Sequence, residues 1–161
     1  MANRLRLRPL AEDDVAGLRR IHSTPEVAFW WDVPEDDFPL SDEPEANRLT
    51  IVVDGAVAGM IQFLEETEPR YRHAAIDVFL DPALHGQGFG TEAVRRLVAH
   101  LIEDRGHHRV TIDPACENVA AVRSYTKAGF RPVGVMRQSE REVGGDVWRD
   151  CLLMEVIAGE D

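Results

Sequence analysis

The stretch of this sequence best suited to bind a ligand is a six-residue turn with three glycines, HGQGFG at residues 85–90. It follows an alternating apolar segment at residues 75–80 and precedes a helical pattern at residues 91–104. Glycine lets a backbone approach a ligand closely, and the free N–H groups of a helix N-terminus favour an anion. The pattern predicts a phosphate-binding turn, with a tight strand-to-helix connection as the alternative. The turn lacks the features of a dinucleotide fingerprint and of a P-loop.

Two carboxylates lie on segments that are expected to be neighbouring strands. Asp113 directly follows the predicted short strand at residues 109–112, and Asp77 lies in the preceding predicted strand. A strand, a helix and a second strand in this order form a parallel pair, and ligands bind at the carboxyl ends of such strands. The two side chains could hold one cationic group and remove a proton from it. A turn cap for Asp113 and an ion pair with an arginine for Asp77 stay open as alternatives.

A predicted helix at residues 119–128 brings an amide and a phenol to the same region. Asn118 is an N-cap by residue type, and Gly129 fits the end of the helix. The phenol of Tyr125 has an ordinary pKa near 10 and could protonate a leaving group. A packed core aromatic is the alternative for Tyr125, because Val122 lies three residues before it on the same helix.

The apolar patterns predict a single α/β domain over residues 1–161. A first helix is expected to start at residues 11–14 and to end before Pro25, and the Asp54-Gly55 pair predicts a two-residue hairpin turn. The predicted strands are residues 4–8, 49–53, 56–64, 70–80, 109–112, 131–138 and 146–157.

Composition narrows the classes of partner. The formal net charge of -11 argues against nucleic acid or an anionic membrane as the main partner. It suits a cationic substrate, and a solvated acidic surface is an equal alternative. The two cysteines form no CxxC pair, and His73, His107 and His108 lack metal-ligand spacing, so we expect no metal and treat these histidines as surface or loop residues. Without a signal-peptide core or a membrane-length apolar run, the chain is expected to be cytoplasmic.

Two segments resemble the GNAT superfamily of acyl-CoA-dependent N-acyltransferases. The turn at residues 85–90 resembles that family's Arg/Gln-x-x-Gly-x-Gly/Ala pyrophosphate loop, with His85 in place of the usual Arg or Gln. Residues 118–130 resemble the family's Asn-x-x-Ala-x-x-x-Tyr-x-Lys-x-Gly-Phe segment at every marked position. The resemblance covers about residues 51–154. It implies a GNAT-like α/β fold, in which a central mixed, twisted sheet has helices on both faces and its parallel fourth and fifth strands splay apart.

The same resemblance implies acetyl-CoA as the co-substrate. The glycine turn would hold the pyrophosphate through N–H groups, and the fourth strand and an asparagine would contact the pantetheine arm. Tyr125 would lie close to the sulfur and protonate the departing thiolate. The residues assigned to the cofactor in this way are Phe79, Leu80, Gln87, Gly88, Gly90, Thr91, Asn118 and Lys127. A solvated position is the equal alternative for the lysine.

Three consecutive aromatic residues, Phe29, Trp30 and Trp31, cannot share one face of any element. One or two are expected to pack inward while another faces a cleft or solvent. The trio resembles the paired-tryptophan segment beside the acceptor site of the aminoglycoside 6′-N-acetyltransferases within the family. The Ile-Asp and Asp-Pro pairs that contain Asp77 and Asp113 resemble pairs on the fourth and fifth strands of that group. By this similarity the two carboxylates would bind the amine, and one would act as base, directly or through water.

These features predict acetyl-CoA-dependent N-acetylation of a small cationic amine, with the 6′-amine of an aminoglycoside as the preferred acceptor. Acetylation of a protein or peptide amine is the second hypothesis, and it requires the acidic loop at residues 32–45 to form an open groove. A non-catalytic acyl-CoA-binding module is the third hypothesis, against which Asn118 and Tyr125 argue. A monomer or homodimer without nucleic-acid or membrane partners is expected.

Overall fold

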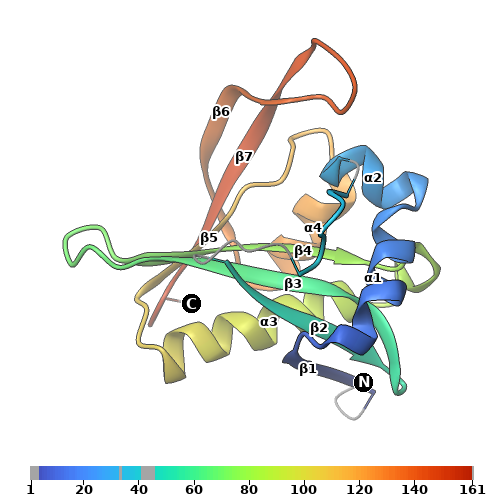
Figure 1. Cartoon of the computed structure of the whole chain (residues 1–161). Coiled ribbons are helices and arrows are strands. Elements are labelled where there is room, and N and C mark those ends of the chain that lie inside the picture. Colours follow the sequence, from blue (N-terminus) through green and yellow to red (C-terminus); the bar gives the residue numbers. More distant parts are fainter. Residues whose placement is uncertain (1–3, 33, 41–45, 161) are drawn as a thin grey trace.

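A central seven-stranded mixed sheet organises the computed structural model, which describes residues 4–32, 34–40 and 46–160 (Figure 1). The strands are β1 (Leu5–Pro9), β2 (Ala46–Val53), β3 (Ala56–Glu66), β4 (His73–Leu80), β5 (Arg109–Ile112), β6 (Arg131–Arg141) and β7 (Trp148–Ile157). The helical segments are η1 (Glu12–Asp14), α1 (Val15–His22), α2 (Pro25–Trp31), η2 (Pro82–Leu84), α3 (Phe89–Ala99), η3 (His100–Asp104) and α4 (Val119–Lys127). The strand order is β1-β2-β3-β4-β5-β7-β6, and only β4 and β5 run parallel. The predicted mixed α/β sheet is therefore confirmed.

Helices cover both faces of the sheet, and each face has its own apolar core (Figure 1). Phe89 and Leu97 of α3 are fully buried against one face. Leu18 of α1 packs on the other face with Met60 of β3. Met60 and its neighbour Ile61 belong to opposite cores because side chains alternate along a strand. Each such buried side chain contributes about 1.5–3 kcal/mol, so both layers are fixed to the sheet.

Most predicted elements are present, with shifted ends. The segment β5 matches the predicted residues 109–112, and the hairpin between β2 and β3 turns at Asp54 and Gly55, whose φ angles are 51° and 81°. The helix predicted for residues 91–104 begins earlier, at Phe89, and is α-helical only to Ala99. Strand β6 extends to Arg141, beyond the predicted end at 138.

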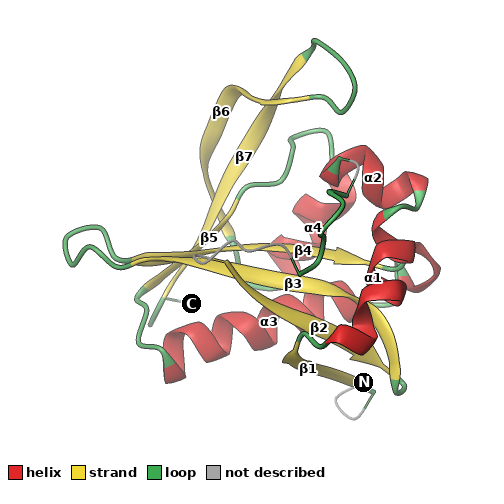
Figure 2. Cartoon of the chain, in the orientation of Figure 1, coloured by secondary structure: helices red, strands yellow, loops and turns green. Residues whose placement is uncertain are grey.

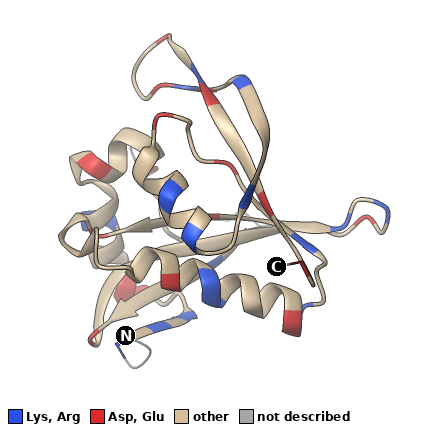
Figure 3. Ribbon diagram, turned by 180° about the vertical axis from the view of Figure 1, so that it is seen from behind, with Lys and Arg blue, Asp and Glu red and all other residues tan. Residues whose placement is uncertain are grey.

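Part of the acidic loop at residues 32–45 cannot be compared with its prediction, because residues 33 and 41–45 lie outside the described residues. Acidic residues occur on helices, strands and loops, so the negative charge is not confined to one segment (Figure 3). None of the helices in the described ranges has the length and apolar character needed to cross a membrane. The same ranges contain no group of three or more His, Cys, Asp or Glu residues that could hold a metal ion.

Strands β4 and β5 are paired only where they begin. Their parallel pairing, over the described residues, consists of Ala74 with Val110 and Ala75 with Thr111. Strand β4 continues to Leu80, whereas the shorter β5 ends at Ile112 and pairs with β7 on its other side. The two strands therefore part after a short common segment, which is the splay that the resemblance to the GNAT superfamily implies.

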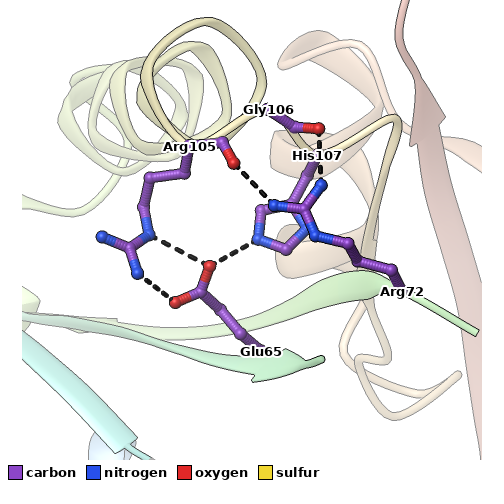
Figure 4. A network of polar contacts seen from close by, with 5 residues as sticks. All are labelled: Glu65, Arg72, Arg105, Gly106 and His107. Carbon is purple, nitrogen blue, oxygen red and sulfur yellow. Dashed lines mark hydrogen bonds and ion pairs between the residues drawn. The ribbon is translucent and has the colours of Figure 1, made fainter. Parts of the chain in front are cut away.

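A polar network holds the closed end of this opening (Figure 4). Glu65, near the end of β3, accepts two hydrogen bonds from Arg105 and one from Nε2 of His107. Arg72, just before β4, donates to the carbonyls of Arg105 and Gly106 at 2.7 Å. The hydrogen bonds from Arg105 are the main cause that lowers the pKa of Glu65 to about 2. His107, expected on the surface or in a loop, lies in a loop but is buried, because its ring completes this network.

We expect Glu65→Gln to destabilise the fold by about 2 kcal/mol at neutral pH, because the folded state loses a carboxylate whose pKa it depresses. The wild-type advantage should be complete above the unfolded pKa of about 4.5 and should vanish as the pH falls toward 2. Urea unfolding of both proteins at pH 7 and pH 3 measures the difference. The neighbouring exposed Glu66→Gln is the control, and an equal loss at both pH values would contradict the prediction.

Candidate active site

The opening between β4 and β5 leads into a cleft of ≈ 1520 Å³. Its walls come from α2, β4, the turn at residues 85–90, the start of α3, α4 and the ribbon of β6 and β7. Figure 2 shows this ribbon rising from the sheet on the side where α2 lies. Sites for one drug-sized ligand measure roughly 300–1000 Å³, so this cleft has room for two substrates.

The glycine turn has the conformation that its sequence requires. Gly86 and Gly88 have φ angles of 76° and 86°, in the left-handed region that side chains with a Cβ rarely adopt. Gly88 is also the N-cap residue of α3, so the helix N-terminus opens beside the cleft. The side chain of Gln87 donates to the carbonyl of Ala83 at 3.3 Å. Because this side chain already has a partner, the predicted contact of Gln87 with the cofactor rests on its backbone N–H.

Most residues predicted to contact the cofactor lie together on the walls of this cleft. Two of them also hold helices in place. Asn118 accepts a hydrogen bond from the N–H of Ala121 at 3.2 Å, which confirms it as the N-cap of α4. Thr91 shares a 2.8 Å hydrogen bond with the hydroxyl of Ser124, which joins α3 to α4. The predicted residues that line the cleft are Phe79, Leu80, Gly88, Gly90, Thr91, Asn118 and Lys127.

The two predicted carboxylates and the phenol line the same cleft and affect one another electrostatically. Asp77 is half-buried and accepts a 3.4 Å hydrogen bond from Gln62, and burial raises its pKa. Partial burial, followed by the charges of Asp77 and Glu140, raises the pKa of Asp113 to about 6. Burial, followed by the same two aspartates, raises the pKa of Tyr125. The cleft therefore concentrates negative charge where water is partly excluded.

The three aromatic residues at the end of α2 form another wall. Trp31 packs inward, with ring centres 5.1 Å from Phe79 and 5.9 Å from His22. Phe29 is 55% exposed, and its ring meets that of Trp30 edge-on at 4.7 Å. The expected division between inward and outward aromatics is confirmed, and all three side chains border the cleft.

Sequence reasoning missed three polar residues around this site. Gln62 lies on β3 opposite Asp77 and is its hydrogen-bond donor. Glu140 on β6 lines the cleft, and it pairs with the buried Arg149 of β7. The Gly-Gly pair at residues 144–145 predicts the β6–β7 turn, but no signal in the sequence fixes the register that makes this pair.

A splayed parallel strand pair, a glycine turn before a helix and a cleft between them are the features of an acyl-CoA-dependent acyltransferase fold. A family model described as an acetyltransferase (GNAT) domain matches residues 4–131. The chain therefore belongs to the GNAT acetyltransferase family, as the sequence motifs predicted. It is therefore an acetyltransferase.

Curated relatives act on more than one kind of amine. The chain is 29% identical over 153 residues to the aminoglycoside N(6′)-acetyltransferase type 1 of Klebsiella pneumoniae, covering 81% of this chain and 75% of that protein. It is 24% identical over 142 residues to the spermidine N(1)-acetyltransferase of Escherichia coli K12, covering 83% and 76%. With the probable N-acetyltransferase YjcK of Bacillus subtilis it shares 29% identity over 108 residues, which is 67% of this chain but only 59% of that protein.

Solved structures share the fold. The aminoglycoside acetyltransferase AAC(6′)-Ib in complex with coenzyme A and kanamycin has a TM-score of 0.79 over 96% of this chain and 95% of that one, at 23% identity. The spermidine N-acetyltransferase of Vibrio cholerae in complex with coenzyme A and spermine has a TM-score of 0.82 over 96% of both chains, at 18% identity. Both likenesses concern the fold alone.

We expect Asp113→Asn to raise the melting temperature by a few degrees at pH 8. The folded pKa of about 6 exceeds the unfolded value near 3.8, so the stability present below pH 3.8 is lost as the pH rises through 6. Asparagine cannot ionise and avoids this loss. Melting curves of both proteins at pH 4 and pH 8 test the prediction, and a difference that is the same at both pH values would contradict it.

Proposed function

We propose that this protein transfers the acetyl group of acetyl-CoA to the 6′-amine of an aminoglycoside, which would modify the antibiotic. The observation that carries the proposal is the pair of carboxylates, Asp77 and Asp113, in one cleft with aromatic walls. Such a cleft is suited to a small cation with flat sugar faces, because carboxylates bind ammonium groups and aromatic rings pack on apolar surfaces. The similarity to an aminoglycoside N(6′)-acetyltransferase supports this choice of acceptor.

The donor side of the cleft suits the phosphates and the pantetheine arm of coenzyme A. In the proposal the N–H groups of the turn, from Gln87 to Thr91, hold the pyrophosphate at the N-terminus of α3. The part of β4 that has parted from β5, Phe79 and Leu80, contacts the arm through its backbone. Asn118 donates to the arm through its amide nitrogen, and the exposed Lys127 approaches the phosphates. The bound cofactor supplies an acetyl thioester, the electrophile of the reaction.

The acceptor amine must lose a proton before it attacks. An aliphatic ammonium has a pKa of about 10.4, and an ordinary carboxylate near 4 is a weak base for it. The raised pKa of Asp113, about 6, narrows this difference while leaving the carboxylate ionised above neutral pH. We assign proton removal to Asp113, directly or through water, and cation binding to Asp77, with Trp30 and Trp31 against the sugar. The neutral amine then attacks the thioester carbonyl.

The departing thiolate must be protonated in the second half of the reaction. Tyr125 is the candidate donor, because its phenol lines the cleft with both aspartates and is protonated at neutral pH. Its raised pKa shows that the site disfavours the phenolate, which makes the phenol a poorer acid toward the thiolate. The phenol first donates a hydrogen bond to the sulfur and then gives up its proton as the carbon–sulfur bond breaks. The attacking nitrogen loses its second proton to solvent as the amide forms, and solvent restores the proton of the phenol. Because the phenol is a weak acid in this setting, we assign it a supporting share of the rate enhancement.

A polyamine is the second candidate acceptor. The similarity to a spermidine N(1)-acetyltransferase favours it, and a flexible polycation would suit the same acidic cleft. A peptide acceptor would need the loop at residues 32–45, part of which lies outside the described residues. The assay below separates these acceptors.

Neomycin and paromomycin differ only by an amine or a hydroxyl at the 6′ position, so they test the proposal as a matched pair. We expect thiol release from acetyl-CoA with neomycin and none above background with paromomycin.

Asp113→Asn should lower kcat/KM for neomycin about 100-fold, the typical share of one general base. In the wild type, kcat/KM should fall below about pH 6, where the carboxylate becomes protonated. Equal turnover of both antibiotics would rule out the 6′-amine, and turnover of spermidine alone would assign the polyamine reaction.

Replacing the proposed acid tests the leaving-group step separately. Tyr125→Phe should lower kcat about tenfold to 100-fold while changing KM for both substrates less than threefold, because only proton donation to the thiolate is lost. Steady-state kinetics with neomycin and direct titration with coenzyme A provide these values. If the coenzyme A affinity fell as much as kcat, the phenol would be a binding residue instead of an acid.

A further inference from the structure

Arg149 connects two walls of the cleft. Its guanidinium lies 4.7 Å from the ring centre of Trp30 and 5.9 Å from that of Phe29, both on α2. Its Nε donates to the Oε2 oxygen of Glu140 on β6 at 3.1 Å. The residue is only 4% exposed, and its Nη2 has no hydrogen-bond partner among the described residues. A buried cation with an unused donor is costly for a fold, which points to a role at the site.

A distortion of β6 directs Glu140 toward this arginine. Met136 pairs with Cys151 and Glu140 pairs with Arg149, so four steps along β6 match two steps along β7. Within the extra segment Gln138 has a φ angle of 50°, in the left-handed region. Bulges of this kind occur beside active sites, where they re-aim a side chain. Here the bulge brings Glu140 to the cleft wall, and its side chain stays 41% exposed.

The carboxylate of Glu140 is still able to bind a cation although it is paired. The described contacts of its Oε2 oxygen are with Arg149 and, at 3.6 Å, with the thiol of Cys151. A carboxylate can accept about four hydrogen bonds, so this pair leaves capacity for a further donor. The charge of Glu140 also reaches Asp77 and Asp113, since it contributes to raising the pKa of both.

We propose that Glu140 determines specificity by holding a second ammonium group of the acceptor, and that Arg149 is the positioning residue that fixes Glu140 and Trp30 for this contact. This inference rests on the proposed function, because it concerns the acceptor half of the same cleft. In the proposed function, the carboxylates of Asp77 and Asp113 are enough to bind the reacting amine and to remove its proton. A third carboxylate on β6 therefore selects acceptors that carry two or more ammonium groups over monoamines.

A pair of acceptors that differ in the number of ammonium groups tests this inference. Neomycin carries several, whereas 6-amino-6-deoxyglucose carries only one amine at the equivalent carbon. At pH 8, Glu140→Gln should raise KM for neomycin about tenfold and leave kcat within twofold, since one charge-assisted contact is lost. KM for the monoamine should change less than twofold. Glutamine can still accept the hydrogen bond from Arg149, and pH 8 keeps Asp113 ionised in both proteins.

Glu155→Gln is the matched control. Glu155 on β7 accepts a hydrogen bond from Arg109 at 2.9 Å, so it is a second Glu–Arg pair of the same sheet, and it does not line the cleft. Neither acceptor should show a changed KM in this variant. Coenzyme A titration and melting curves of all variants show whether the fold and the donor site are intact.

Arg149→Lys tests the positioning role. Lysine keeps the charge but cannot both lie flat on Trp30 and donate side-on to Glu140. KM for neomycin should rise several-fold with kcat within twofold, and the preference for neomycin over the monoamine should shrink, an effect that loss of stability alone would not produce.

The outcomes separate this inference from the proposed function. If neomycin is acetylated but its KM is unchanged in Glu140→Gln, the inference is overturned and the proposed function stands. If spermidine is the acceptor and its KM rises in Glu140→Gln, the proposed acceptor is wrong and the inference stands. An equal rise of KM for neomycin and for the monoamine would show that Glu140 does not select acceptors by their number of ammonium groups.

Discussion

The short pairing between β4 and β5 is the constraint on which the rest of the structure depends. The two parallel strands share Ala74 with Val110 and Ala75 with Thr111 before they part. The network around Glu65 joins β3 to the loop before β5, next to this pairing. The separation of β4 from β5 therefore begins at a fixed place along the strands. Everything that lines the cleft, from the glycine turn to the β6–β7 ribbon, takes its position from the opening that follows.

Four carboxylates with strongly perturbed environments form two pairs of opposite electrostatic character. Outside the cleft, the buried Asp14 pairs with Arg8 and the partly exposed Glu65 pairs with Arg105. These guanidinium partners hold the pKa of each carboxyl well below its usual range. Inside the cleft, burial is the main cause that raises the pKa values of Asp77 and Asp113, and the charge of Glu140 adds to both shifts. The first pair stabilises the fold at neutral pH, whereas the second destabilises it and is thereby prepared to bind a cation.

Local sequence predicted the structural features of the proposed donor half of the site, because these features are contiguous in the chain. The turn at residues 85–90, the limits of β5 and the cap at Asn118 each depend on a few neighbouring residues. The acceptor half depends on contacts between distant segments. Glu140 lies on the cleft wall just after the bulge of β6, and the guanidinium of Arg149 lies against the ring of Trp30 on α2. Neither the bulge nor this packing has a periodic pattern that a sequence would reveal.

This division has a consequence for how such a fold changes its substrate. The donor is the same molecule for every acetyl-CoA-dependent enzyme, and the elements that suit it, β4, the turn and the start of α3, are joined directly in the chain. The proposed acceptor walls come from α2 and from the β6–β7 ribbon, which can vary without disturbing that unit. Structures with aminoglycoside and with polyamine ligands share this fold at TM-scores of 0.79 and 0.82. Under the proposed function, a contact such as that between Trp30 and Arg149 lies where acceptor choice can change while the chemistry of the thioester stays the same.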